Sequence, residues 1–256
     1  NIMLHIALSH SMFNVINSFI IFLPLIGLLE KLSIKLTRVR PGELEMGPMF
    51  LEKHLLETPP LALAQAIKEI GRMIDCASGG LKEAQKVFFK NDSSLVESIR
   101  QKEDVVDNLQ KEITHYLIEI SERELGKDEA EMIPVLLHCV NDVERVGDHA
   151  INILEIAERR IEQKLPFKEK DLSALQKLVA VTDDMLKDTY IALMNNDVEA
   201  GRRVLVKESR LDALQVELKE REARRVNKEK VNYLSGIVFN DFVDNMEKIG
   251  DHLTNV

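Results

Sequence analysis

The stretch that decides the fold is Asp142–Ile153, which reads DVERVGDHAINI, because it returns at Asn245–Val256 as NMEKIGDHLTNV. The chain therefore contains an internal duplication. In each copy a Glu precedes an Asp by four residues, with Gly directly before the Asp and His directly after it. Because four residues make about one helical turn, both carboxylates of a pair lie on one face of a helix.

A second pair of copies lies upstream of the first. Glu103 and Asp107 repeat 105 residues later, whereas the downstream pairs are 103 residues apart, a difference that a loop between helices absorbs. Any acidic sequence contains Glu-x-x-x-Asp by chance, but these pairs occupy equivalent places in two repeats. The repeated pairs are Glu103 with Asp107, Glu144 with Asp148, Glu208 with Asp212, and Glu247 with Asp251.

The composition is that of a helical protein. The 256 residues include no tryptophan, 5% aromatic residues, 11 Gly and 7 Pro, so strands have little support and we predict an all-α fold. The formal net charge of −9, without a basic stripe, argues against nucleic acid as the main partner. Cys76 and Cys139 lie within helical patterns, which predicts reduced core residues in a cytosolic compartment.

Turn residues and helix caps divide the chain into similar halves. Residues 61–165 are predicted to form a first antiparallel three-helix bundle and residues 166–256 a second, incomplete one. Residues 41–60 contain proline-rich turns and are expected to be a linker. Ser94 with Glu97 predicts a capping box at the start of the second helix. Because the chain stops inside a copy of the repeated stretch, we expect a fragment truncated at its C-terminus.

Apolar residues at three- and four-residue spacing predict the core-facing seam of each helix that carries the duplicated stretch. At about 100° per residue, the acidic pairs lie roughly 90° or more from these seams, on the outer surface of each bundle. The seam residues are Leu136, Cys139, Val143, Val146, Ala150, Ile153 and Ala157 in the first copy, and Phe239, Phe242, Met246, Ile249, Leu253 and Val256 in the second.

Adjacent helices are expected to gather two acidic pairs, and thus four carboxylates, into one patch on each bundle. An all-oxygen patch suits hard cations such as Mg²⁺, Mn²⁺ or iron, which predicts a metal site on each bundle. The alternative is an ordinary solvated helix surface. Gly147 and Gly250 indicate the close approach of a neighbouring helix or of ligands.

Two further residue types lie beside the acidic pairs. His149 and His252 are candidate metal ligands, but each is displaced by one residue from its Asp and points away from its Glu. Asn152 and Asn255 follow each Asp by four residues on the acidic face. We expect these amides to hydrogen-bond the carboxylate cluster.

The N-terminal part is apolar enough to predict a membrane-spanning helix. From Met12 to Leu32 the only charged residues are Glu30 and Lys31. A signal peptide is the alternative, but no basic region precedes the apolar run and no small-residue cleavage site follows it. By the positive-inside tendency we expect an inner-membrane protein whose residues after about 40 are cytoplasmic. The basic residues that support this orientation are Lys31, Lys35, Arg38 and Arg40.

Two stretches resemble known families. The sequence ERVGDHAINI at Glu144–Ile153 resembles the signature of PhoU-family proteins, and the resemblance covers residues 61–256. It implies two three-helix bundles that bind multinuclear iron or zinc clusters on their surface through repeated acidic motifs. LSHSMFNVIN at Leu8–Asn17, followed by FLP at Phe22–Pro24, is similar to the last membrane helix of bacterial sodium/phosphate cotransporters.

Together the resemblances imply the C-terminal part of a sodium-dependent phosphate symporter. Residues 1–40 would be its final transmembrane helix, followed by a cytoplasmic PhoU-like regulatory domain. Sodium and phosphate would be the transported ions, and the partners would be the membrane and a regulatory protein or a second copy. The Gln-Ser-Ser repeats of the family's transport core are absent from this sequence, so no transport residues are assigned.

Two other functions stay open. A stand-alone PhoU-like regulator of phosphate uptake or signalling would need no membrane span. A carboxylate-bridged di-metal protein of the ferritin-like kind would need two Glu-x-x-His motifs, and Glu112 to His115 is the one clear example. The sequence has no nucleophile with a base, glycine-rich phosphate loop or Cys/His metal spacing, so we do not expect an enzyme.

Overall fold

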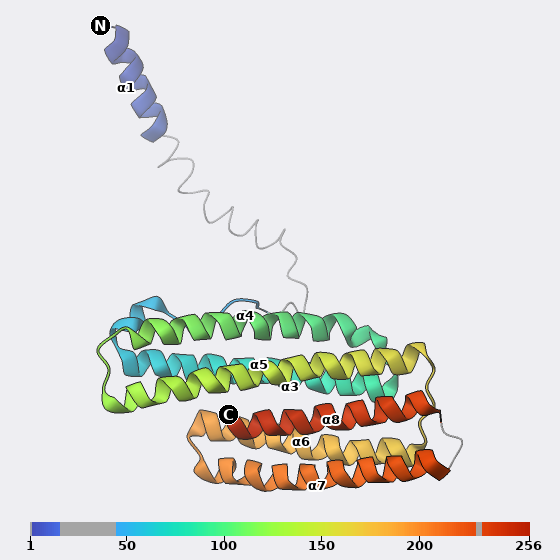
Figure 1. Ribbon diagram of the computed structural model, residues 1–256. Coiled ribbons are helices and arrows are strands. Elements are labelled where there is room, and N and C mark those ends of the chain that lie inside the picture. Colours follow the sequence, from blue (N-terminus) through green and yellow to red (C-terminus); the bar gives the residue numbers. More distant parts are fainter. Residues whose placement is uncertain (1, 16–44, 229–231) are drawn as a thin grey trace. The chain divides into compact units, whose positions relative to one another are not determined.

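Figure 1 shows the computed structural model, which describes residues 2–15, 45–228 and 232–256. Within these ranges every regular element is helical, and there is no β-strand. The predicted all-α class is therefore confirmed for this part of the chain. Residues 1–43 and 44–256 form two separate compact units.

The described part of the first unit is one helix, α1 (Ile2–Val15). Among the residues that the structure describes, no helix is both long enough and apolar enough to cross a membrane. This finding contradicts the predicted transmembrane helix and the inner-membrane location that depended on it. Most of the predicted span, from residue 16 onward, lies outside the described residues.

The first bundle consists of α3 (Pro59–Lys90), α4 (Val96–Ser121) and α5 (Lys127–Glu162). The three helices pack against one another along their lengths. Two short 3₁₀ turns, η2 (Lys53–Glu57) and η3 (Ser93–Leu95), precede α3 and α4.

The stretch before α3 packs against this bundle. The fully buried Glu69 accepts hydrogen bonds through its carboxylate from the backbone N–H groups of Met49 and Phe50, at 2.8 and 2.7 Å. The Tyr116 hydroxyl donates to the backbone oxygen of Glu52 at 3.0 Å. A buried carboxylate is costly unless it is hydrogen-bonded, so the Glu69 contacts hold residues 49 and 50 against α3. The Tyr116 contact holds Glu52 against α4.

The second bundle consists of α6 (Glu169–Asn195), α7 (Val198–Lys228) and α8 (Tyr233–Asn255). Its turns repeat those of the first bundle. Asn91 and Asn196 end α3 and α6 in the left-handed conformation, with φ values of 55° and 52°. Asn tolerates this conformation better than most residues, so the same residue ends the equivalent helix in both copies.

The start of α4 differs from the prediction. The backbone N–H and hydroxyl of Ser94 both donate to Asp92 Oδ1, at 3.2 and 2.6 Å. Asp92 therefore caps η3, and α4 begins at Val96 without a side-chain cap. The predicted capping box is absent because an equally good capping residue lies two positions upstream.

The predicted core seams are buried. All seven seam residues of α5 are buried, and on α8 the first five are buried while Val256 is partly buried. Burying one such side chain contributes about 1.5–3 kcal/mol. Cys139 is 1% exposed, and burial raises the pKa of its thiol to about 11.

The bundles pack together through two helix pairs, α5 with α8 and α3 with α6. The ring centroids of Phe88 and Phe242, from different bundles, lie 4.5 Å apart. The Arg160 guanidinium lies over the rings of Phe88 and Phe167, at 4.9 and 4.8 Å from their centroids, and donates to the Phe88 carbonyl. The two repeats thus share one apolar core.

Candidate metal centres

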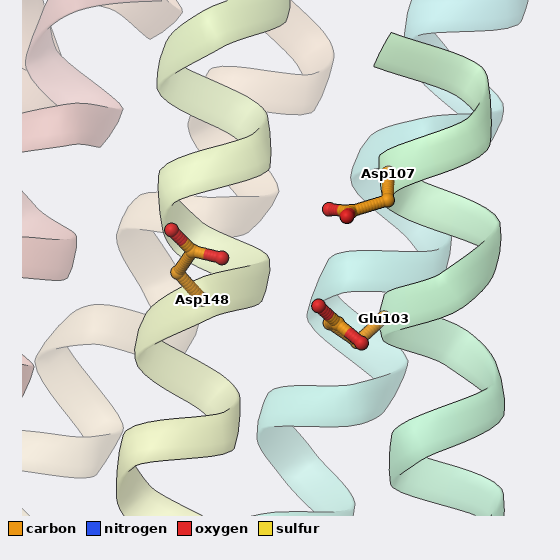
Figure 2. Close-up of side chains that lie close together, drawn as sticks. All are labelled: Glu103, Asp107 and Asp148. Atoms are coloured by element: carbon orange, nitrogen blue, oxygen red, sulfur yellow. The ribbon is translucent and has the colours of Figure 1, made fainter. Parts of the chain in front are cut away.

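The first acidic cluster lies between α4 and α5. Glu103 and Asp107 are one turn apart on α4, and Asp148 lies opposite them on α5. Figure 2 shows Asp107 pointing across toward Asp148, with Glu103 one turn away. One carboxylate oxygen from each of the three residues lies within 4.8 Å of the others. Val106 of α4 and Val146 of α5 are buried in the core, and this orientation of the two helices leaves the carboxylates to meet at the bundle surface.

The second bundle repeats this cluster. Glu208 and Asp212 on α7 lie opposite Asp251 on α8, and oxygens from all three lie within 4.8 Å of one another. All six residues are partly buried. The structure therefore brings together equivalent residues from both copies of the duplication.

Glu144 and Glu247 lie beside these clusters rather than within the same 4.8 Å. Burial and then the nearby Asp148 raise the pKa of Glu144. Burial and then Asp251 raise the pKa of Glu247 in the same way. Each bundle thus gathers four interacting carboxylates, as the sequence predicts, although only three are close enough to share an ion without movement.

The electrostatics of the first cluster favour a bound positive charge. Burial and then Asp107, Asp104 and Asp148 raise the pKa of Glu103 above its usual 4.5. Like charges at short range disfavour the ionised form, and an opposite charge reverses this effect. The site therefore holds protons more tightly than separated carboxylates do, and a cation would replace them.

One basic residue accompanies the acidic pair of α5 and another the acidic pair of α8. Arg145 Nη1 lies 3.6 Å from Asp148 Oδ2, and at the equivalent place Lys248 Nζ lies 2.9 Å from Asp251 Oδ2. The two basic side chains are 61% and 54% exposed. Ion pairs this exposed contribute little, so they offset only part of the repulsion among four carboxylates.

The two glycines allow close helix packing behind the acidic pairs. A Cβ added at Gly147 would lie 3.1 Å from Cγ1 of Val106 on α4, and one added at Gly250 would overlap Leu211 on α7. The predicted close approach of a neighbouring helix is confirmed. The missing side chains let α5 and α8 come near the helices that carry the other acidic pairs.

The histidines contact the opposite bundle. His149 Nδ1 lies 2.8 Å from Asn245 Oδ1, and His252 Nδ1 lies 2.8 Å from Asp142 Oδ1. The two imidazole rings are 5.5 Å apart at their centroids. Neither histidine belongs to the three-carboxylate clusters of the described residues.

Asn152 and Asn255 lie beside these histidine contacts. Asn255 Nδ2 donates to Asp142 Oδ1 at 3.3 Å, and Asn152 Nδ2 lies 3.4 Å from His149 Nδ1. Both asparagine side chains therefore hydrogen-bond or contact residues at the interface between the bundles, rather than the cluster carboxylates. Their role as hydrogen-bonding partners of the acidic pairs stays a prediction.

The sequence analysis does not predict two ion pairs that lie beside the clusters. Lys102 Nζ lies 2.8 Å from Glu83 Oε2, and Lys207 Nζ lies 2.6 Å from Asp188 Oδ2. Each lysine directly precedes a cluster glutamate, and each pairs with an acid 19 residues upstream on the preceding helix. This repeated 19-residue spacing is the signal that would have revealed them.

The chain is similar to proteins linked by name to phosphate transport. It is 26% identical over 198 residues to the phosphate-specific transport system accessory protein PhoU homolog of Clostridium acetobutylicum, covering 76% of this chain and 88% of that protein. It is 26% identical over 206 residues to the putative inorganic phosphate export protein YjbB of Salmonella typhimurium, covering 76% of this chain and 36% of that protein.

The fold is similar to a solved structure. The crystal structure of PhoU from Pseudomonas aeruginosa matches with a TM-score of 0.72 and 16% identity, over 75% of this chain and 92% of that one. At this identity the likeness concerns the fold. It agrees with the two tandem three-helix bundles described above.

These matches correct the interpretation of the chain as the C-terminal part of a sodium/phosphate cotransporter. The Clostridium relative, matched over 88% of its length, is an accessory protein. The match to the export protein reaches only 36% of that protein's length. No helix among the described residues is able to span a membrane. The symporter, sodium and membrane assignments are therefore wrong.

Both copies of the duplication carry one family's pattern. The model of the PhoU domain family matches residues 70–157 and 175–256, which are more than half of the chain. The first range contains the acidic pairs of α4 and α5, and the second contains those of α7 and α8. This chain belongs to the PhoU domain family.

Proposed function

We propose that the chain is a PhoU-like regulator of phosphate transport whose two acidic faces bind metal ions. Its family and the name of its Clostridium acetobutylicum relative, an accessory protein of a phosphate-specific transport system, support the regulatory role. A regulator acts by changing how it binds a partner. Metal binding would change the charge of the acidic faces, so we propose that a partner binds there and that its affinity changes with bound metal.

The donor atoms fit a hard cation. Each cluster offers carboxylate oxygens from three residues within 4.8 Å, with a fourth carboxylate beside them. Oxygen ligands suit Mg²⁺, Mn²⁺ and iron, whereas zinc more often takes histidine or cysteine ligands as well. Glu103, Asp107 and Asp148 would hold a metal on the first bundle, with Glu144 beside them. Glu208, Asp212, Asp251 and Glu247 would repeat this arrangement on the second.

Bound metal would have two consequences for each bundle. It would neutralise carboxylates whose mutual repulsion opposes their gathering. It would also bridge two helices, since Asp107 lies on α4 and Asp148 on α5. A bridged face with less negative charge presents a more rigid surface to a regulatory protein partner or to a second copy than a face whose carboxylates repel one another.

The di-metal alternative has less support. Glu112 and His115 are both exposed on α4, and the His115 side chain is 70% exposed. His115 Nε2 lies 3.3 Å from Glu119 Oε1 on the same helix. A carboxylate-bridged centre of the ferritin-like kind has its ligands inside the bundle, so this motif does not form one.

The regulatory role is tested in a bacterial strain whose own PhoU-type regulator has been deleted. The rate of labelled phosphate uptake is measured with and without expression of this chain. We expect the chain to lower uptake in phosphate-rich medium. Unchanged uptake, with the protein present at normal levels on an immunoblot, would contradict the proposal.

A variant of the acidic faces then tests whether they carry the regulation. Asp107→Asn, Asp148→Asn, Asp212→Asn and Asp251→Asn are combined, and the control combines Glu162→Gln with Glu169→Gln, two exposed acids outside the clusters. We expect the control to regulate uptake normally and the four-site variant to fail. If the four-site variant regulates uptake as well as the unsubstituted chain, the clusters are not required for regulation.

A further inference from the structure

A stripe of exposed residues runs along α7, on the side opposite to the buried Val204, Leu211 and Leu218. Its members recur at alternating three- and four-residue spacing, as the contact positions of a coiled coil do. All of them are exposed, and Val206 and Val216 near its centre are 73% and 55% exposed. The α7 stripe consists of Glu199, Arg202, Val206, Ser209, Ala213, Val216, Glu220 and Ala223.

The α7 stripe faces away from the rest of its bundle. The helix packs against α6 and α8. Figure 1 shows it along the outer edge of the second bundle. The stripe is therefore open to another molecule.

The first copy of the duplication is polar at the equivalent places. On α4, 105 residues earlier, the four central positions hold Gln101, Asp104, Asn108 and Lys111. Gln and Lys favour a helix more than Val does, so the valines of the stripe do not serve to stabilise α7 itself. An exposed valine gains free energy only when a further surface removes it from water. The stripe is thus suited to a contact that α4 does not make.

The charges along the α7 stripe make it complementary to itself. Arg202 lies near its start and Glu220 near its end. Within one chain Arg202 Nη1 lies 2.6 Å from Glu199 Oε1, and Arg224 Nη2 lies 2.5 Å from Glu220 Oε2. All four side chains are more than half exposed, so they are able to meet further charges. Two such stripes match when one is turned end to end against the other.

We propose that the α7 stripe binds a second copy of this chain, with the two α7 helices antiparallel about a twofold axis beside Leu211. In this register Val206 of each chain faces Val216 of the other, and Ser209 faces Ala213. The stripe is symmetric about position 211, so every contact occurs twice, as a twofold interface requires. Ser209 and Ala213 are small, which lets the two helices approach closely at the axis.

The same register pairs opposite charges. Arg202 faces Glu220 of the second copy at both ends of the contact, and Arg203 faces Glu217 beside the stripe. Arg210 meets its own counterpart beside the axis, which weakens the pair. A parallel arrangement would place Arg202 against Arg202 and Glu220 against Glu220, so the charges favour the antiparallel one.

The contact is about 36 Å long at 1.5 Å per residue, but its apolar centre is small, so we expect a weak dimer whose chains exchange. Sedimentation equilibrium of the full chain, with chelator present to remove metal, measures the dimerisation. One variant combines Val206→Asp with Val216→Asp. The matched control is Val135→Asp, at a 56% exposed valine on α5.

We expect dimers to form as the concentration rises into the high micromolar range. The double variant should weaken dimerisation by about tenfold or more, and the control should leave it unchanged. A chain that stays monomeric throughout this range would overturn the proposal. Dimerisation that the double variant does not weaken, or that Val135→Asp weakens as much, would also overturn it.

A second experiment tests the direction of the pairing. A Val206→Cys chain and a Val216→Cys chain are mildly oxidised, each alone and then mixed, and the unsubstituted chain with its native Cys76 and Cys139 serves as the blank. A disulfide needs the two Cα atoms within about 7 Å. We therefore expect disulfide-linked dimers in the mixture and not in either chain alone. Linked dimers of each chain alone, or none in the mixture, would overturn the antiparallel arrangement.

A charge exchange tests the complementarity. Arg202→Glu alone should weaken dimerisation by about tenfold, because it places two acidic ends together. Adding Glu220→Arg to the same chain should restore it, because opposite charges meet again across the contact. Circular dichroism checks that both variants stay helical. Failure of the second substitution to restore the dimer would contradict the pairing of Arg202 with Glu220.

Discussion

His252 donates from Nδ1 to Asp142 Oδ1 across 2.8 Å, and this contact joins α8 of the second bundle to α5 of the first. His149 and Asn245 make the equivalent contact at the same distance. The two pairs are related by the 103-residue offset of the duplication, with Asp142 in the place of Asn245. The bundles are thus joined by the same residues that follow each cluster aspartate.

Removing one partner of this contact should loosen the interface. We expect Asp142→Ala to lower the free energy of unfolding by about 1–3 kcal/mol, because it leaves a partly buried imidazole without its acceptor. Asp142→Asn should lose less, since Asn245 already serves His149 as an acceptor. Urea unfolding measures both. An equal loss in the exposed control Asp104→Ala would contradict this role for Asp142.

Gly250 and Gly201 form a matched pair for testing close helix packing. Ala is favoured over Gly by about 1 kcal/mol in a helix, and a Cβ at Gly201 meets nothing within 4 Å, so Gly201→Ala should stabilise. Gly250→Ala should destabilise by about 1–3 kcal/mol, because its methyl group overlaps Leu211. Thermal unfolding of the two variants shows whether each substitution raises or lowers stability. Stabilisation by both would show that α8 is not held close to α7.

Asp188 should contribute stability that depends on pH. Its hydrogen bonds from Arg203 and Lys207 lower its pKa from the usual 3.8, so this stability is present above pH 3.8 and is lost as the pH falls through the lower, folded value. We expect Asp188→Asn to cost about 2 kcal/mol at neutral pH and progressively less below about pH 4. Glu199→Gln, in a pair that is 69% exposed on both sides, should change little at either pH. A pH-independent cost would contradict the ion-pair explanation.

Metal affinity should fall as the pH is lowered. The pKa values of Glu103, Glu144 and Glu247 are raised above the usual 4.5, so protons compete with metal from above that pH. We expect Mn²⁺ to bind measurably more weakly at about pH 5.5 than at about pH 7.5 in calorimetric titrations. Equal affinity at the two pH values, in a chain that stays helical by circular dichroism, would show that these carboxylates are not the ligands.

Helix periodicity and the duplication were sufficient to predict the six-helix plan, the buried seams and the gathering of the acidic pairs. Val146 and Met246 are buried where the spacing places them. The sequence also indicated that Gly147 packs against a neighbouring helix, because a glycine inside a helix is unfavourable unless space demands it.

The contacts between the bundles could not be predicted from the sequence. Periodicity assigns a residue to a face but not to a partner on another helix, so His252 was weighed as a metal ligand and its contact with Asp142 was missed. The membrane prediction failed because hydropathy alone assigned residues 12–32 to a bilayer. The matches to the PhoU domain family and to an accessory protein over 88% of its length overturn the assignment that depended on it.

The most direct test of the proposed metal centres is elemental analysis of the full chain purified after incubation with Mn²⁺ or iron. One variant combines Asp107→Asn with Asp148→Asn, another combines Asp212→Asn with Asp251→Asn, and the control combines Glu162→Gln with Glu169→Gln. We predict that the chain and the control bind metal at both bundles, and that each cluster variant loses the metal of its own bundle only. Cluster variants that keep as much metal as the control would contradict the account and leave the acidic pairs as solvated helix surface.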